Sequence, residues 1–368
     1  MSARLHLARL PAAAALIAAA ACGGAKPTAP GPTPVPTCTF TNPVASSGQD
    51  PWVVRSNGFY YLIESGSAGI TVYKSATLTA PKQNGVLIWQ RPGTGWNSAN
   101  VWAPELHFVD GKWYVYYAAG VPGPNNQFTN QRAGVLESAG SDPQGTYVDR
   151  GMLYTGDSIE TTGGTVTTGS GNRWAIDLTV HRIGADLYAV WSGWMFNAGT
   201  DRTPQHLYVA RMSNPYTIAT NRAKISSPTA PWEKGTELDL QEGPELLEHG
   251  GKTFIVYSTR ESWLPAYQLG ELRLDNTAAP MDSLSYTKIG PVFSGTSSVY
   301  GVGHVSFTKS PDGSEDWIVY HSKKTTAPGW DRDIRTQKFG WNADGSPNFG
   351  TPVPAGVAVA RPSGECTP

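Results

Sequence analysis

The stretch Tyr114-Val115-Tyr116-Tyr117, which reads YVYY, is one copy of an aromatic and aliphatic segment that recurs along this chain of 368 residues. The other copies are YYLI at 60–63, YAVW at 188–191, FIVY at 254–257 and WIVY at 317–320. Turn residues such as Asp110-Gly111 usually precede a copy, and small or polar residues follow each one. Short apolar runs bounded by turn residues indicate β-strands in hairpins.

The spacing of these copies predicts the architecture. They begin at residues 60, 114, 188, 254 and 317, about 64 residues apart on average, and five such units nearly fill the chain from Cys38 to Cys366. Sustained helical periodicity is absent, and 41 Gly and 29 Pro disfavour long helices. We therefore expect an all-β, five-bladed β-propeller in which each blade is a four-stranded antiparallel sheet. A pair of β-sandwiches is the alternative, which five such repeats fit poorly.

Composition narrows the class of ligand. The net charge is −1 and the isoelectric point is about 6.7, so no basic excess exists to neutralise the phosphates of a nucleic acid. The chain nevertheless contains 13 Trp and 16 Tyr. Aromatic rings at that density exceed the need of a plain core, and flat rings that stack on sugars would use the surplus.

The N-terminus reads as an export signal rather than as part of the fold. Arg4 and Arg9 precede an apolar run at 10–21 that ends in three alanines before Cys22. This layout predicts a lipoprotein-type signal peptide at 1–21, with lipidation of Cys22; ordinary secretion is the alternative. The Pro-rich residues 22–37 are expected to form an extended tether. The domain at 38–368 would then be extracytoplasmic and would touch a membrane only through its lipid anchor.

Two cysteines remain once Cys22 carries lipid. Cys38 and Cys366 stand at the two ends of everything that looks folded. Export permits a disulfide between them, and this pairing would make the termini neighbours, as closure of a propeller ring requires. Two free thiols are the alternative.

An acidic residue precedes four of the five repeated strands by nine to twelve residues, and a histidine precedes the fifth by thirteen. These residues are Asp50 in QDPWVV, Glu105 in WAPELHF, Asp177 in WAIDLTV, Glu242 in LQEGPELL and His304 in GVGHVSF. In a propeller the first strand of each blade lines the central channel, so the five side chains would converge on one axis. Mutual repulsion would push the pKa values of such carboxyl groups apart. Two carboxyl groups with different pKa values across a sugar-sized gap are the apparatus of glycoside hydrolysis.

Each of these residues also has a structural interpretation. Asp50 before Pro51 is typical of a turn, and Glu105 could satisfy backbone donors at a strand end. Asp177 could be a buried structural acid, and His304 a core histidine. Glu245 competes with Glu242 for the same role, because residues three apart on a strand face opposite sides and only one would reach the funnel.

The same motifs, in order and over nearly the whole chain after the tether, resemble those of glycoside hydrolase family 43. Within the family the sequence is most similar to α-L-arabinofuranosidases, including exo-acting enzymes, and the family fold is a five-bladed propeller. The resemblance implies that Asp50 is the general base and Glu242 the general acid of an inverting mechanism. Asp177 matches the third carboxylate, which raises the pKa of the acid and orients it. His304 matches an axial histidine that often lies beside a calcium ion.

The sequence departs from the family pattern at two positions, and several side chains are candidates for binding the substrate. Leu178 stands where a small residue is expected and could narrow the pocket, and Val305 stands where asparagine is common, which weakens the expectation of an ion site. The expected substrate-binding residues are Trp102, Glu105, Trp194 and Arg335, and Trp263 could flank the cleft.

The sequence thus predicts a monomeric glycosidase that removes arabinofuranosyl units from arabinan, arabino-oligosaccharides or arabinoxylan, with no cofactor required for the chemistry. An endo-arabinanase and a β-xylosidase are alternatives on the same scaffold. A propeller that binds carbohydrate without activity is the alternative outside the enzymes, and the retention of Asp50, Asp177 and Glu242 together argues against it.

Overall fold

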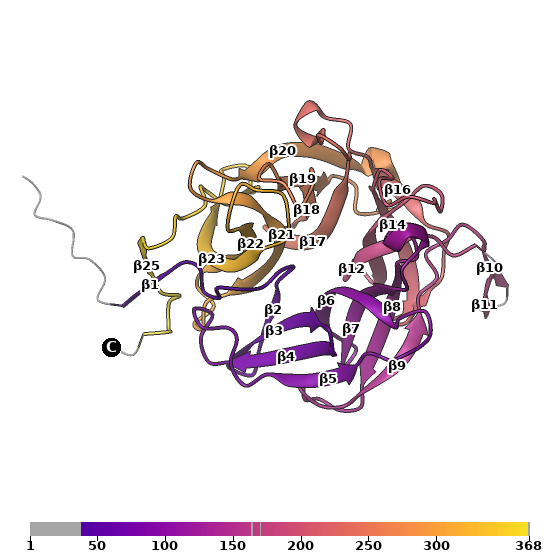
Figure 1. Cartoon of the computed structure of the whole chain (residues 1–368), viewed down its shortest axis with the longest axis horizontal. Helices are drawn as coiled ribbons and strands as arrows, with labels where there is room; N and C mark the ends of the chain where they lie inside the picture. The colour runs from indigo at the N-terminus through magenta and orange to yellow at the C-terminus, as the bar shows by residue number, and fades with distance from the viewer. Residues whose placement is uncertain (1–37, 163–164, 170, 367–368) are drawn as a thin grey trace, which may run out of the picture. The chain divides into compact units, whose positions relative to one another are not determined.

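The computed structural model describes residues 38–366 apart from 163–164 and 170, so the predicted signal peptide, Cys22 and the tether lie outside the described residues. Five antiparallel sheets follow one another in chain order around a ring (Figure 1). The prediction of an all-β, five-bladed β-propeller is confirmed. No helix in the described part of the chain is long and apolar enough to cross a membrane.

The blades are formed by consecutive strands. Blade 1 contains β2 (Trp52–Ser56), β3 (Phe59–Gly66), β4 (Gly69–Ser75) and β5 (Val86–Gln90). Blade 2 contains β6 (Ala99–Val109), β7 (Lys112–Gly120), β8 (Arg132–Ser138) and β9 (Tyr147–Met152). Blade 4 contains β17 (Gln241–His249), β18 (Lys252–Thr259), β19 (Gln268–Leu274) and β20 (Tyr286–Ser294). Blade 5 contains β21 (Tyr300–Lys309), β22 (Asp316–Lys323), β23 (Arg332–Trp341) and β24 (Pro347–Asn348).

Blade 3 departs from the expected four strands. It contains β12 (Ala175–Ile183), β13 (Asp186–Gly193) and β14 (His206–Asn214), and two short strands, β15 (Thr217–Ile218) and β16 (Ala223–Ser226), both pair with β14. The outer position of this blade is therefore divided between two segments. A separate hairpin of β10 (Ile159–Thr162) and β11 (Thr165–Thr168) precedes the blade. The short 3₁₀ helices are η1 (Pro124–Asn126), η2 (Pro231–Glu233) and η3 (Ser283–Ser285).

The repeated aromatic segment forms the second strand of every blade: β3, β7, β13, β18 and β22. This strand lies between the inner strand and the third strand, and the blades on either side cover both of its faces. A strand that is covered on both faces reads as a continuous apolar run rather than as an alternating one. Each interface between neighbouring blades has its own buried cluster, including the one between blades 5 and 1, where Phe40 packs against Trp317.

The inner strands close the ring. Each of β2, β6, β12, β17 and β21 contacts the inner strand of the next blade, and β21 contacts β2. The axis of the ring is therefore surrounded by five strands from all parts of the chain, and residues at equal height on those strands face one another.

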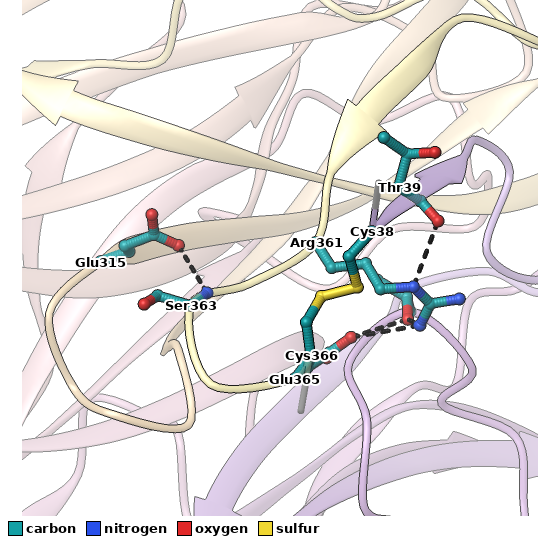
Figure 2. Close-up of a disulfide and its surroundings, with 8 residues drawn as sticks. Cys38, Thr39, Glu315, Arg361, Ser363, Glu365 and Cys366 are labelled. Carbon is teal, nitrogen blue, oxygen red and sulfur yellow. Dashed lines mark hydrogen bonds and ion pairs between the residues drawn. A yellow bond between two sulfur atoms is a disulfide. The ribbon is translucent and has the colours of Figure 1, made fainter. Parts of the chain in front are cut away.

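The two ends of the described chain are joined where blades 5 and 1 meet. The strand β1 (Thr39–Thr41) pairs antiparallel with β25 (Ala358–Ala360). Cys38 and Cys366 form a disulfide with their Cα atoms 6.2 Å apart. Figure 2 shows Arg361 beside this bond, where its Nε donates to the carbonyl oxygen of Thr39. The closure uses a separate two-stranded ribbon, because blade 5 itself consists only of C-terminal strands.

Candidate active site

A pocket of about 610 Å³ opens at the end of the ring where the inner strands begin. It brings together Asp50 from blade 1, Asp177 from blade 3 and Glu242 from blade 4, with His304 from blade 5. Trp102, Phe128 and Trp174 form part of its wall on one side, and Trp263, Trp330 and Arg332 on the other. The lining is completed by Gln49, Ile176, Asp201, Arg202, Gln205, Leu238, Ser262, Pro328 and Gly329.

A repeated backbone feature points side chains into this pocket. Every blade has a residue with a positive φ at a corresponding place at or just before its inner strand: Asp50 (48°), Ala103 (41°), Asp177 (54°), Gly243 (53°) and His304 (48°). Asn100 of β6 (49°) and Gly301 of β21 (52°) are further residues with a positive φ on these strands. Irregular pairing accompanies the repeated feature in the four inner strands β6, β12, β17 and β21. Left-handed backbone at a residue other than glycine costs about 1–3 kcal/mol and is typical of functional sites. β-Bulges change the direction of a side chain, which here brings Asp50, Asp177 and His304 to one level of the channel.

This feature corrects the sequence-based alignment of the acids. Ala103 and Gly243 occupy the level at which Glu105 and Glu242 were expected. Glu242 stands one residue earlier and lines the pocket, as do its counterparts Gln49, Trp102 and Ile176. Glu105 stands two residues after Ala103, is buried, and lies outside the pocket lining.

Glu105 belongs to a second level of the channel. The residues two positions after the five corresponding positive-φ residues are Trp52, Glu105, Thr179, Glu245 and Ser306. Trp52 Nε1 donates to Oε2 of Glu245 at 3.1 Å, and Oε2 of Glu105 lies 2.8 Å from Nε2 of His107. The bulge at Gly243 breaks the strict alternation of the strand, so Glu242 and Glu245 both point into the channel, at different levels. Only Glu242 lines the open pocket, so the expectation that one of the two reaches the funnel is confirmed, although strict strand alternation is not the reason.

Asp50 is held in its ionised form. Its Oδ1 lies 3.1 Å from Nη1 of Arg332 and 3.3 Å from Nδ1 of His304. Burial alone would raise the pKa of Asp50, but His304, His321 and Arg332 together outweigh burial and hold that pKa well below its usual range. The backbone N–H of Asp50 donates to Nδ1 of His321 at 3.1 Å.

The pKa values of Glu242 and Asp177 are raised rather than lowered. Burial raises the pKa of Glu242 to about 7, and the carboxylate of Asp50 adds to the rise, while hydrogen bonds and Arg332 oppose it. The Oε1 of Glu242 accepts a hydrogen bond from the hydroxyl of Tyr267 at 2.9 Å. Burial, followed by repulsion from Glu242 and Asp50, raises the pKa of Asp177 well above its usual range. The Oδ2 of Asp177 accepts from the N–H of Gly243 at 3.0 Å, which fixes it beside Glu242.

The pocket therefore contains an ionised carboxylate, Asp50, and a carboxyl group, Glu242, whose pKa is raised to about 7. Such a pair can remove a proton from water and donate a proton to a leaving group in the same step. The two tasks fall to side chains from different blades, which is the arrangement that the sequence predicted.

Besides Glu105, two more of the expected substrate-binding residues lie outside the pocket. Trp194 is fully buried and stacks on Trp174, with ring centroids 4.3 Å apart, so Trp174 presents a ring to the pocket and Trp194 supports it. Arg335 is buried against Asp333 and Ser322. Arg332 lines the pocket instead, because residues three apart on β23 face opposite sides. These two expectations are corrected, whereas Trp102 and Trp263 do line the pocket.

Sequence reasoning missed several pocket residues. Arg332, Tyr267 and His321 each contact a carboxyl group in the pocket, and Phe128 packs edge-on against Trp102 at 4.8 Å. Nothing in the local sequence distinguishes Arg332 from Arg335. Leu178, which was expected to narrow the pocket, is buried in the cluster between blades 2 and 3.

The surroundings of His304 do not form a protein cage for calcium. Calcium takes six to eight oxygen ligands, and the described residues contain no group of three or more His, Cys, Asp and Glu side chains that could hold a metal ion. Asp50, the carboxylate beside His304, is paired with Arg332. The calcium ion stays a prediction, and no step below depends on it.

Comparison with known proteins agrees with this geometry. A family model described as "Glycosyl hydrolases family 43" matches residues 40–347. An extracellular exo-α-(1→5)-L-arabinofuranosidase of Streptomyces avermitilis is 35% identical over 89% of this chain and 66% of its own length. A protein of the same name from Streptomyces chartreusis is 32% identical over 88% of this chain and 95% of its own. The crystal structure of an α-L-arabinofuranosidase from Lactobacillus brevis superposes with a TM-score of 0.75 at 31% identity, covering 86% of this chain and 98% of that one.

The chain thus spans about two thirds of the Streptomyces avermitilis relative and nearly all of the Streptomyces chartreusis one.

Proposed function

Because the chain belongs to glycosyl hydrolases family 43, we propose that it is a glycosidase that releases α-L-arabinofuranosyl units from arabinan, arabino-oligosaccharides or arabinoxylan with inversion of configuration. The observation that carries the proposal is the pair of Asp50 and Glu242 in one pocket, the first held ionised and the second with its pKa raised to about 7. The names of the related proteins support arabinofuranosides as the substrate class.

The residues divide the reaction as follows. Glu242 donates its proton to the glycosidic oxygen while the bond from that oxygen to the anomeric carbon breaks. Asp50 accepts a proton from the water that attacks the opposite face of the sugar. Protonation of the leaving group and activation of the water each contribute about 10²–10⁴-fold to such a rate. Asp177, held by the N–H of Gly243, lies beside Glu242 and orients it.

Arg332 and His304 keep Asp50 available as a base. The guanidinium of Arg332 also donates to the carbonyl oxygen of Ser262 at 2.9 Å, which fixes it between blades 5 and 4. Trp102, Phe128 and Trp174 offer aromatic surface to the sugar on the other side of the pocket. Aromatic faces and a few convergent polar groups are what a sugar site requires.

Contacts around the rim support attack at a chain end. The Oδ2 of Asp201 accepts from the N–H of Phe128 at 3.2 Å, which joins the loops of blades 2 and 3. Arg202 forms an ion pair with Glu237 at 3.0 Å, and its guanidinium lies 4.9 Å from the ring centroid of Trp263. The N–H of Gly329 donates to the carbonyl oxygen of Trp263 at 2.9 Å. The rim is thus bridged from blade 2 to blade 5, which leaves little room for a polymer to pass through on that side.

We further propose that the protein acts outside the cytoplasm. Two relatives are named as extracellular, and the signal-like N-terminus predicts export with lipidation at Cys22. Radiolabelled palmitate incorporation by the protein, compared with Cys22→Ser, tests the anchor. The monomeric state and the absence of nucleic acid binding stay predictions.

The sugars released from four substrates test the proposed function. The purified protein is incubated with arabinan, α-1,5-arabino-oligosaccharides, arabinoxylan and xylobiose, and the products are separated. We expect arabinose alone, with the β-anomer as the first product by NMR. A ladder of oligomers would instead indicate an endo-arabinanase, and xylose a β-xylosidase. Binding without any product would indicate a carbohydrate-binding propeller.

A further inference from the structure

A buried tyrosine connects the proposed acid with the far side of the pocket. Tyr267, which directly precedes β19, has no exposed surface, and its hydroxyl donates to Oε1 of Glu242 at 2.9 Å. Its ring lies nearly parallel to that of His321, with centroids 5.6 Å apart and 10° between the planes. His321 in turn accepts the backbone N–H of Asp50. The one aromatic stack therefore touches the proposed acid on one side and the proposed base on the other.

The place of this ring is fixed by a glycine on the neighbouring blade. A Cβ atom at Gly303 would lie 2.2 Å from Cε1 of Tyr267. That separation is far shorter than any van der Waals contact, so a larger residue at this position would push the ring away. Gly303 of β21 thereby leaves the space that lets Tyr267 reach Glu242.

The direction of the hydrogen bond to Glu242 is set by a backbone group. The N–H of His304 donates to Oγ of Ser258 at 2.8 Å, and a backbone N–H cannot accept. The hydroxyl hydrogen of Ser258 is then available to the oxygen of Tyr267, and Ser258 lowers the pKa of Tyr267, as a donor to that oxygen would. The hydroxyl hydrogen of Tyr267 is left for Glu242. The series from His304 N–H through Ser258 and Tyr267 to Oε1 of Glu242 therefore runs in one direction.

We propose that this relay makes Tyr267 and Ser258 positioning residues for the acid: it keeps the proton of Glu242 off Oε1 and so places it on Oε2, the oxygen that protonates the substrate. The inference rests on the proposed function for the identity of the acid. In the reaction the Oε2 proton goes to the glycosidic oxygen as the bond to the anomeric carbon breaks. The water oxygen bonds to that carbon and its proton goes to Asp50. Exchange with solvent then returns Glu242 to the protonated form and Asp50 to the ionised form.

The relay also stabilises the negative charge of Glu242 after this residue has given up its proton. Once Glu242 has lost its proton, the Tyr267 hydroxyl donates to a carboxylate, and a hydrogen bond to an ionised group is stronger than one to a neutral group. The bond therefore favours the ionised form and lowers the pKa of Glu242. The other charged or titratable groups that face Glu242 are Asp50, Asp177 and Arg332, and the variants below leave all three in place.

Titration of Glu242 tests the relay without any substrate. Protein labelled with ¹³C at the glutamate carboxyl carbon is titrated by NMR, and Glu242→Gln identifies the signal. Tyr267→Phe should raise the pKa of Glu242 by about one unit. Ser258→Ala should raise it by less. Tyr257→Phe is the matched control, because it removes a buried hydroxyl that donates to Glu233 at 2.7 Å away from the pocket. A pKa that is unchanged or lowered in Tyr267→Phe would overturn the proposal.

Leaving-group dependence tests the consequence for catalysis. Tyr267→Phe should lower kcat about 10–100-fold for α-1,5-arabinobiose, whose leaving group needs a proton. It should change kcat less than about threefold for 2,4-dinitrophenyl α-L-arabinofuranoside, whose leaving group does not. Equal losses on both substrates would mean that Tyr267 has only a structural role. If Tyr267→Phe does not fold, Gly303→Ala displaces the same ring and should give the same pattern, and Ser258→Ala a weaker one.

The two proposals fail separately. Wild-type protein that releases no sugar from any arabinofuranoside contradicts the proposed function, while the NMR titration still decides whether Tyr267 donates to Glu242. Active wild-type protein with an unshifted Glu242 in Tyr267→Phe contradicts the relay alone.

Discussion

Two pairs of acids lie at different levels along the axis of this propeller, and they differ in almost every property that matters for chemistry. Asp50 and Glu242 line an open pocket, and Arg332 faces both. Glu105 and Glu245, one level deeper, are outside the pocket lining and have Thr179, Trp52 and His107 as hydrogen-bonding partners. The residue type is the same at both levels, so the charged partner and the opening to solvent decide which acids can react.

The difference in partners explains the difference in pKa. Burial raises the pKa of Glu105 and of Glu245 well above the usual range, and no cation offsets it. In the pocket, Arg332 and the two histidines reverse the effect of burial for Asp50. The lower level thus contains neutral acids that serve as hydrogen-bonding groups. The upper level contains the ionised Asp50 together with Glu242 and Asp177, whose pKa values are raised.

The largest expected effect on activity comes from replacing Asp50 and Glu242, the pair of acids in the pocket. Asp50→Asn and Glu242→Gln should each lower kcat about 10²–10⁴-fold, since each removes one of the two proton transfers. Circular dichroism should show unchanged folding. If Glu245→Gln abolishes turnover while Glu242→Gln remains active, the assignment of the acid is wrong.

A smaller effect is expected from removing Arg332, the cation that the upper level has and the lower level lacks. Arg332→Gln should raise the pKa of Asp50 toward its ordinary value of about 4, so the loss of activity on the acidic side moves up into the measurable range. The alkaline limb should also move up, because Arg332 lowers the pKa of Glu242. We expect kcat/KM to fall about 10–100-fold at neutral pH.

Arg332→Lys is the control for this change, because it keeps the positive charge. The two variants are compared by kcat/KM between pH 4 and pH 9. A pH profile of Arg332→Gln that superposes on that of the wild type would show that Arg332 does not control Asp50.

The smallest effect on activity, below about threefold, is expected from Glu105→Gln and Glu245→Gln. Their effect should lie in stability instead. The unfolded chain ionises these acids above about pH 4.5, whereas burial keeps them protonated in the folded state. Because the pKa of each acid is raised in the folded protein, its contribution to the free energy of unfolding is fully present below about pH 4.5. That contribution is lost as the pH rises from there toward the pKa of the folded state.

Glutamine cannot ionise, so the variants avoid this loss of stability. For each unit by which the pKa in the folded state exceeds that in the unfolded state, the loss in the free energy of unfolding reaches about 1.4 kcal/mol. Urea unfolding at pH 4 and pH 7.5 measures it. The variants should gain stability relative to the wild type only at the higher pH, and equal differences at both values would contradict neutral acids at the lower level.

The sequence was sufficient for the blades because their central strands are apolar on both faces and are separated by turn residues. YVYY at 114–117 and its counterparts became the second strand of every sheet. The acids of the pocket were also predicted, since Asp50, Asp177 and Glu242 precede those strands at similar distances. The ring of inner strands then brings them together.

The heights of the side chains along the axis could not be predicted. The positive φ of Ala103 and of Gly243 shifts the register by one or two residues. Nothing in WAPELHF marks the bulge, and in LQEGPELL the only signal is Gly243, since a glycine inside a strand often marks a bulge. Arg332 and Tyr267 come from third strands or from the turns before them, where only the fold decides which side chain reaches the axis. Such contacts depend on tertiary packing between blades rather than on local pattern.

The pH dependence of kcat/KM for α-1,5-arabinobiose tests the central claim most directly, because the claim is that one pocket keeps Asp50 ionised and Glu242 protonated. Activity requires both forms. We predict a profile that stays flat on the acidic side down to at least about pH 5 and falls about tenfold per unit above a pKa of about 7. An acidic limb near pH 6, or full activity up to about pH 9, would contradict the account.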